Sequence, residues 1–225
     1  MSGARSGFDR LAGPYRVLEF AAFGRDLERA RFAFLGRLAG CRDILLLGEG
    51  DGRCAARLAA IAPGARILCV DSSPGMIARA TRRISPADAA RVTFLCADVL
   101  SFVPEPGAFD AAATLFFLDC FDEASVAAIV ARVGPALRPG AQWLFADFVL
   151  AAGGMARLRA RAWLAVLYAF FRAGTGLRTS SLPPSERVLE SAGWALAEGK
   201  EFQGGLVRSA LYLRGAPTAA PAASA

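Results

Sequence analysis

The sequence predicts an α/β fold built on a doubly wound, mostly parallel β-sheet. Three observations predict it: strongly apolar segments alternate with helical segments over residues 44–148, a glycine-rich turn joins the first apolar segment to a helix, and acidic residues follow the ends of several apolar segments. Regular alternation of strands and helices is typical of parallel sheets that carry helices on both faces. In such sheets, ligands bind beyond the carboxyl ends of the strands.

The first apolar segment and the turn after it carry the clearest signal. Residues 44–47 are all apolar, which predicts a strand buried on both faces. Gly48, Gly50 and Gly52 follow at alternate positions, and residues 54–61 have helical character. Glycine permits a sharp turn with no Cβ between backbone and ligand, and a helix N-terminus offers free N–H groups. We predict a ligand site at this turn; a tight turn without a ligand is the alternative.

The remaining elements follow in order. Further strands are predicted at residues 65–70, 92–96, 109–117 and 142–148, with helices at 26–39, 74–84 and 123–137. Ser73 and Asp122 stand where helix N-caps are expected. A short helix up to Ala192 precedes two strands, 194–202 and 206–213, whose connection at Gly204-Gly205 indicates a hairpin. Asp71, Asp98 and Asp119, like Gly48, all follow strand ends and are therefore expected to converge.

Composition limits the function classes. A chain of 225 residues suits one sizeable domain. The net charge of +6 comes from scattered arginines and one lysine, Lys200, so it gives nucleic-acid binding no support beyond the charge itself. There is no histidine and no CxxC pair among the five cysteines, which argues against a metal site, a disulfide framework and a histidine base. No apolar run reaches about 18 residues and no secretory signal opens the chain, so we expect a cytoplasmic protein.

Several segments taken together resemble the class I S-adenosylmethionine-dependent methyltransferases, particularly the small-molecule branch around the ubiquinone and menaquinone enzymes. These segments are 44–52, 70–76, 96–99, 109–110 and 137–140. The resemblance implies a Rossmann-like, seven-stranded sheet of order 3-2-1-4-5-7-6 with the seventh strand antiparallel. The expected organisation is an N-terminal helical arm or lid at 1–40, a cofactor-binding domain at 41–214 that includes a substrate-side helix at 155–172, and a disordered tail at 215–225, rich in alanine, proline and serine.

The same resemblance implies S-adenosyl-L-methionine as the cofactor. Asp71 would accept hydrogen bonds from both ribose hydroxyls, and Asp98 would take the adenine amino group. The alternative for both residues is an ordinary helix cap or a solvated carboxylate. The full set of implied cofactor-binding residues is Gly48, Glu49, Gly50, Gly52, Asp71, Ser72, Met76, Asp98, Val99 and Phe116.

One position departs from the family pattern. Leu46 stands where the family usually has an acidic residue that helps to orient the methionine end of the cofactor. Glu49, at a different position on the turn, is the candidate substitute. The departure keeps open a second function, a non-catalytic or regulatory cofactor-binding protein with the methyltransferase fold.

A third function is an NAD-dependent oxidoreductase. Gly50, Gly52 and Ala55 satisfy the dinucleotide pattern GxGxxA, and Asp71 follows roughly 20 residues later. The terminal hairpin argues against this function because a dehydrogenase would continue with further strand–helix units.

The methyl acceptor is predicted to be a small, partly apolar molecule such as a quinol, a polyketide or a lipid. Asp119 is the candidate catalytic base, with capping of the helix at Glu123 as its alternative. The arginines of helix 155–172 suggest peripheral contact with an anionic membrane, although a core helix with a solvated arginine edge is equally consistent. The candidate acceptor-binding residues are Tyr15, Phe117, Trp163 and Tyr168.

Overall fold

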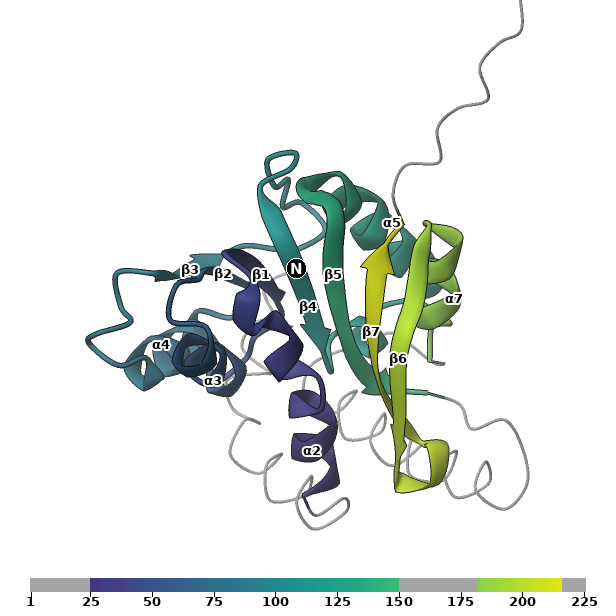
Figure 1. Cartoon of the computed structure of the whole chain (residues 1–225), viewed down its shortest axis with the longest axis horizontal. Helices are drawn as coiled ribbons and strands as arrows, with labels where there is room; N and C mark the ends of the chain where they lie inside the picture. The colour runs from purple at the N-terminus through teal and green to yellow at the C-terminus, as the bar shows by residue number, and fades with distance from the viewer. Residues whose placement is uncertain (1–24, 150–181, 216–225) are drawn as a thin grey trace, which may run out of the picture.

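A seven-stranded mixed sheet forms the centre of the molecule. The computed structural model describes residues 25–149 and 182–215 (Figure 1). The strand order is β3-β2-β1-β4-β5-β7-β6, and β7 runs antiparallel to both β5 and β6. The predicted strand order and orientation are therefore confirmed. The strands are β1 Asp43–Leu47, β2 Arg66–Asp71, β3 Val92–Cys96, β4 Phe109–Leu115, β5 Leu137–Phe148, β6 Trp194–Phe202 and β7 Val207–Arg214.

Helices cover both faces of this sheet because successive residues of the central strand are apolar. On β1, Ile44 and Leu46 pack with the α3 side of the core, whereas Leu45 and Leu47 pack with α5 and α7 on the other face. Figure 1 shows α2 near the end of the sheet to which the β4 and β5 arrows point. The helices are α2 Asp26–Phe32, α3 Arg53–Ile61, α4 Pro74–Arg83, α5 Glu123–Val133 and α7 Ser185–Ser191, with short 3-10 segments η1 Leu35–Gly40, η2 Leu118–Cys120, η3 Gly134–Ala136 and η4 Gln203–Gly205.

Both predicted N-caps are confirmed. The side chain of Ser73 accepts the N–H of Met76 at the start of α4, and Asp122 accepts the N–H of Ser125 at the start of α5. Each cap satisfies one of the N–H groups that a helix start leaves without an intrahelical partner. These two caps fix where the chain turns back from the carboxyl ends of β2 and β4.

Three predicted elements were too long. The helix expected over 26–39 breaks after α2, where Phe34 leaves helical geometry and η1 takes over to bury Leu35 and Leu38. The helix expected over 123–137 ends at Val133, because Pro135 has no N–H for the helical ladder. The strand expected over 109–117 ends at Leu115 because Phe116 adopts a left-handed φ of 57°.

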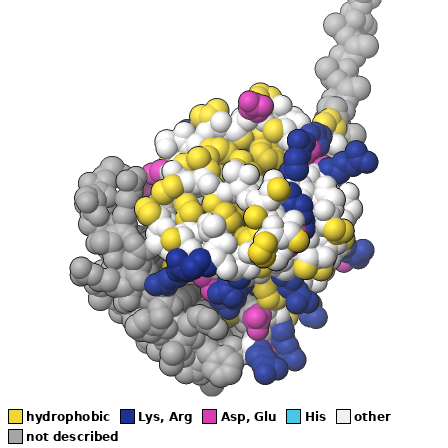
Figure 2. All heavy atoms as spheres, turned by 90° about the vertical axis from the view of Figure 1, so that its left-hand side faces the viewer, with side chains coloured by type: hydrophobic (Ala, Val, Ile, Leu, Met, Phe, Trp, Pro, Cys, Tyr) yellow, Lys and Arg dark blue, Asp and Glu magenta, His cyan; other side chains and the backbone are white. Residues whose placement is uncertain are grey.

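The edge formed by β3 is partly apolar. Figure 2 looks onto this side of the molecule and shows hydrophobic side chains across its middle, with arginine and lysine side chains to the right of them and below them. Leu95 on β3 and Val103 in the following loop are among the exposed large hydrophobic residues. Within the described part of the chain, no helix is both long enough and apolar enough to span a membrane.

Candidate functional site

The glycine turn between β1 and α3 depends on three left-handed backbones. Gly48, Gly50 and Gly52 have φ of 65°, 66° and 85°, a region that side chains with a Cβ rarely adopt. A Cβ on Gly52 would lie 2.5 Å from Cα of Ala80 on α4, so this glycine lets the two helices pack closely. A Cβ on Gly50 would meet nothing within 4 Å. Gly52 is therefore packed against α4, whereas no described residue would contact a Cβ on Gly50; we call this second side the open face of the turn.

Asp71, the last residue of β2, is tied to this turn. Its Oδ2 accepts the backbone N–H of Gly50 at 3.0 Å, and its Oδ1 accepts the N–H of Ser73 at 2.8 Å. Both oxygens are thus held in fixed positions beside the open face of the turn. A carboxylate oxygen can accept more than one hydrogen bond, so the pair can also receive two hydroxyl groups of a ligand.

The predicted adenine-side residues lie at the ends of β2 and β3. Asp98 is half-buried, and its Oδ1 accepts the N–H of Leu100 at 3.0 Å. A backbone hydrogen bond holds the two strand ends together, since the N–H of Ala97 donates to the carbonyl of Asp71 at 3.0 Å. Met76 is half-buried in the first turn of α4. Of the other two residues predicted here, Ser72 is exposed and Val99 is buried.

Leu46 and Glu49 are both buried, but they have different surroundings. Leu46 is 2% exposed and belongs to the apolar core between the sheet and α3. Glu49 is also buried, and its Oε1 accepts the N–H of Ala55 at 2.9 Å in the first turn of α3. Burial raises the pKa of Glu49 to about 7, against the lowering effect of the Ala55 N–H and of the Arg31 charge. An acidic group is therefore present at the turn, although it comes from a different residue.

Arg31 is a site residue that the sequence analysis missed. It lies on α2, donates from Nη1 to the carbonyl of Leu115 at 3.2 Å, and stacks over the ring of Phe116 at 4.9 Å. Its charge acts on both Glu49 and Asp119. The contact with Leu115 joins residues 84 apart in the chain. The pattern of apolar residues that predicts α2 contains no sign of this contact.

Two neighbouring phenylalanines point in different directions after β4. Phe116 packs edge-to-face on Phe148, with ring centroids 5.5 Å apart, and against Arg31. Phe117 lies over the glycine turn, where its Cδ2 would be 1.9 Å from a Cβ on Gly48. Glycine at position 48 therefore allows the Phe117 ring to approach the backbone. Of the two rings, the structure places that of Phe117 against the turn.

Asp119 lies next to a second acid, Asp147, which the sequence analysis also missed. Asp119 does not cap α5, since Asp122 does so. Instead its N–H donates to Oδ2 of Asp147 at 3.0 Å, and the two carboxyl groups share a hydrogen bond. Burial raises the pKa of both residues, and the neighbouring Asp119 charge raises the pKa of Asp147 further. Burial likewise raises the pKa of the Cys120 thiol well above its usual value, so this thiol is not an activated nucleophile.

Other predicted residues fall outside this constellation. Tyr15, Trp163, Tyr168 and the helix expected at 155–172 lie outside the described residues, as does the tail from residue 216. Within 25–149 and 182–215, no group of three acidic or cysteine side chains could hold a metal ion.

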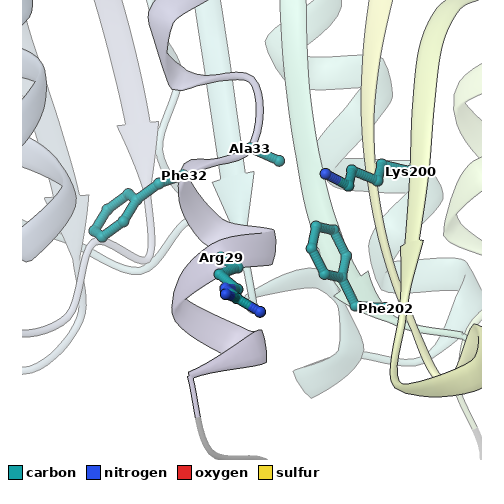
Figure 3. Close-up of a pocket in the computed structure, with 5 residues that line it drawn as sticks. All are labelled: Arg29, Phe32, Ala33, Lys200 and Phe202. Carbon is teal, nitrogen blue, oxygen red and sulfur yellow. The ribbon is translucent and has the colours of Figure 1, made fainter.

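A separate hollow lies between α2 and the hairpin. This cavity of about 520 Å³ is lined by Arg29, Phe32, Ala33, Lys200 and Phe202. In Figure 3, Lys200 extends from β6 toward α2, whereas the Phe32 ring points away from β6. None of the predicted cofactor residues lines it, so the cavity and the glycine-turn site are distinct.

Comparisons with known proteins agree with the fold. Residues 44–140 match the family described as Methyltransferase domain. A demethylmenaquinone methyltransferase of Thermus thermophilus is 38% identical over 111 residues, which are 48% of this chain and 50% of that protein. The match thus spans half the length of this relative.

Solved structures extend the agreement over nearly the whole chain. The N-methyltransferase NodS of Bradyrhizobium japonicum, crystallised with S-adenosylhomocysteine, has a TM-score of 0.63 at 17% identity and covers 95% of this chain and 99% of its own. The 1,6-didemethyltoxoflavin N1-methyltransferase of Burkholderia thailandensis has a TM-score of 0.64 at 16% identity, with 93% and 87% covered. These structures show that the chain has the fold of S-adenosylmethionine-dependent methyltransferases, and the family match covers residues 44–140 of it, in agreement with the resemblance in its sequence.

Proposed function

We propose that this protein transfers a methyl group from S-adenosylmethionine to a small-molecule acceptor. The observation that carries the proposal is the carboxylate of Asp71, which is fixed by the N–H groups of Gly50 and Ser73 beside the open face of the turn. A carboxylate so fixed suits a pair of neighbouring hydroxyl groups, because charged acceptors form stronger hydrogen bonds than neutral ones. The ribose of the cofactor carries such a pair.

The adenine is assigned to the ends of β2 and β3. Oδ1 of Asp98 accepts the N–H of Leu100, and we assign its second carboxylate oxygen, Oδ2, to the adenine amino group. Ser72, which follows Asp71, and Met76, in the first turn of α4, are assigned to positions beside the adenine. The backbone N–H of Val99 is assigned to the adenine ring. These roles, like that of Asp71, are part of the proposal.

The methionine end is assigned to Glu49 and Arg31. That end carries one ammonium and one carboxylate, and these two side chains offer one charge of each sign near the glycine turn. With the ammonium beside it, Glu49 would be held in its charged form, because an adjacent opposite charge lowers the pKa of a carboxyl group. In this assignment Glu49, on the glycine turn, takes the role of the acid that the family usually has at the position of Leu46.

The chemistry asks little of the protein beyond alignment. When bound, the cofactor supplies an electrophilic methyl group that is displaced in line. The residues of the chain align the two reactants and exclude water, which converts a bimolecular reaction into an effectively unimolecular one. Phe117 lies at the right place for this task, since its ring covers Gly48 and packs on Phe121 with centroids 5.1 Å apart.

The acceptor is proposed to be partly apolar, such as a quinol, a polyketide or a lipid. The aromatic pair Phe117 and Phe121 supports an apolar lining on the described side of the site. The Thermus thermophilus relative is a demethylmenaquinone methyltransferase, which also favours a quinol as the acceptor. Peripheral membrane contact stays a prediction, because the helix that suggests it lies outside the described residues.

The two alternatives differ in what they bind and do. A non-catalytic cofactor-binding protein was suggested by Leu46, but the buried Glu49 restores an acid to the turn. An NAD-dependent oxidoreductase is disfavoured because the sheet ends in an antiparallel hairpin, whereas the dinucleotide-binding fold continues with parallel strands.

Calorimetric titration separates the three functions. The proposal predicts binding of S-adenosylmethionine and S-adenosylhomocysteine but not of NAD. It further predicts transfer of a labelled methyl group to at least one member of a panel of quinols, phenols and lipids. Binding of NAD alone would support the oxidoreductase. Tight binding of S-adenosylmethionine with no transfer to any member of the panel would support the non-catalytic protein.

A further inference from the structure

Two carboxyl groups meet at the carboxyl ends of β4 and β5, where the acceptor is expected. Asp147 is the second-last residue of β5 and is 1% exposed, whereas Asp119, in η2 after β4, is only half-buried. Oδ2 of Asp147 accepts the Asp119 N–H at 3.0 Å, and Oδ1 accepts the Phe148 N–H at 3.2 Å. The inner acid, Asp147, is thus fixed by two backbone N–H groups, and the outer acid, Asp119, is the more exposed of the two.

The hydrogen bond between the two carboxyl groups requires a proton on one of them. Two neighbouring carboxyl groups, one of them buried, cannot both ionise without strong repulsion. Burial and the Asp119 charge together raise the pKa of Asp147 well above its usual value. Asp119 instead has Arg31 acting on it from α2 and receives the Cys120 S–H at 3.6 Å. These directions favour the proton on Asp147 and the negative charge on Asp119.

Other charged groups near the pair leave this distribution unchanged. Arg208 lies opposite Asp147 on β7, but its guanidinium pairs with Glu186 and Glu201. Asp71 contributes a negative charge on the β2 side that acts on Cys120. The charge of Arg31, on α2, lowers the pKa of Asp119.

We propose that Asp119 and Asp147 act as a proton-sharing pair, in which Asp119 is the general base for a weakly acidic hydroxyl group on the acceptor and Asp147 is its positioning residue. The inference rests on the proposed methyl transfer and specifies its substrate class. A phenol or an enol fits because such a hydroxyl becomes a strong nucleophile only when it loses its proton. The chain has no histidine to accept that proton.

The step balances without a further reactant. The hydroxyl oxygen gains the methyl group as the carbon–sulfur bond of the donor breaks, and the hydroxyl proton passes to Asp119. The pair then holds two protons and no charge. Because Asp119 is half-buried and Asp147 fully buried, one proton returns to solvent through Asp119 and restores the starting state.

Infrared spectroscopy of the whole chain tests the shared proton. At about pH 9 Glu49 is ionised, since its pKa is about 7, and isolated carboxyl groups are ionised as well. We expect the wild type to show a carboxylic acid C=O band, sensitive to deuterium exchange, that is absent from Asp147→Asn and unchanged in the exposed control Glu105→Gln. A wild type without the band, or an Asp147→Asn variant that keeps it, would overturn the pairing.

Methyl transfer tests the base. Hydroquinone serves as the hydroxyl probe, with labelled S-adenosylmethionine as donor. Asp119→Asn keeps the backbone N–H bond to Asp147 and should slow transfer by about 100-fold or more, the usual contribution of a general base, with Glu105→Gln as the control. Equal transfer by wild type and Asp119→Asn would refute the role of Asp119. Calorimetry distinguishes the failure of the two proposals. If the wild type does not bind S-adenosylmethionine, the proposed methyl transfer is contradicted. If it binds the cofactor but shows no infrared band, only the proton-sharing pair of Asp119 and Asp147 is contradicted.

Discussion

The carboxylate of Glu49 accepts the backbone N–H of Ala55 at 2.9 Å, so the acid of the glycine turn is anchored to the first turn of α3. The bond places an acid at the turn, although position 46 itself carries a leucine. Leu46 faces the apolar core under α3, and the negative charge comes from the turn that follows β1. A helix N-terminus favours that charge because its N–H groups carry partial positive charge.

The first prediction concerns stability and pH. Burial raises the pKa of Glu49 from 4.5 to about 7 in the folded protein, so between these values the folded state binds more protons than the unfolded state. The contribution of Glu49 to the free energy of unfolding is therefore fully present below pH 4.5 and is lost as the pH rises to about 7. The loss amounts to about 3 kcal/mol over this range. Urea unfolding of the ligand-free protein at a series of pH values measures the loss.

Glu49→Gln supplies the comparison. Glutamine keeps an oxygen that can accept the Ala55 N–H but does not ionise, so the variant should lack this part of the pH dependence. Glu105→Gln, in an exposed loop, should behave as the wild type does. Parallel stability curves for wild type and Glu49→Gln would show that Glu49 titrates normally in the folded protein.

The second prediction concerns Arg31. If its guanidinium holds the carboxylate of the methionine end, Arg31→Ala should weaken S-adenosylhomocysteine binding by about 10- to 100-fold, the usual effect of losing a hydrogen bond to a charged group. Arg29→Ala is the matched control, because Arg29 lies two residues away on the same helix and is 71% exposed. Calorimetry measures the affinity of both variants for S-adenosylhomocysteine. Equal affinities would contradict the assignment of Arg31 to the cofactor carboxylate.

The third prediction separates two effects of glycine. Gly52→Ala should destabilise the fold by about 3 kcal/mol, because the new Cβ is strained at φ 85° and collides with Ala80. Gly107→Ala shares the left-handed φ, at 63°, but meets nothing within 4 Å, so it should cost only about 1 kcal/mol. Thermal and urea unfolding give both values. Equal losses would mean that α4 moves away from the turn without cost.

Much of the fold could be predicted because its signals are local. Four apolar residues before the glycines indicate β1. The caps Ser73 and Asp122 could be predicted, and are confirmed, because a cap and the N–H group that it accepts lie only three residues apart. Element ends were less predictable. The left-handed backbone of Phe116 ends β4 early, although phenylalanine gives no sign of such a conformation.

The missed site residues have a common physical reason. Arg31 acts through contacts with the end of β4, and Asp147 acts through a bond to a residue 28 positions away. In the sequence, Arg31 is one of several arginines on a helix, and Asp147 is one acid between two apolar residues of a strand. Only the packing of α2 and the neighbouring ends of β4 and β5 brings them to the site. The roles assigned to Asp98, Val99, Ser72 and Met76 stay predictions.

The most direct test of the central claim is calorimetric titration of S-adenosylhomocysteine into wild type, Asp71→Ala and the exposed control Glu105→Ala. The two bonds that Asp71 receives from Gly50 and Ser73 orient its carboxylate for the ribose, so Asp71→Ala should lose about 100-fold or more in affinity. Urea unfolding of the same samples verifies that the variant is folded. Glu105→Ala should bind as the wild type does. A folded Asp71→Ala protein with wild-type affinity would contradict the account.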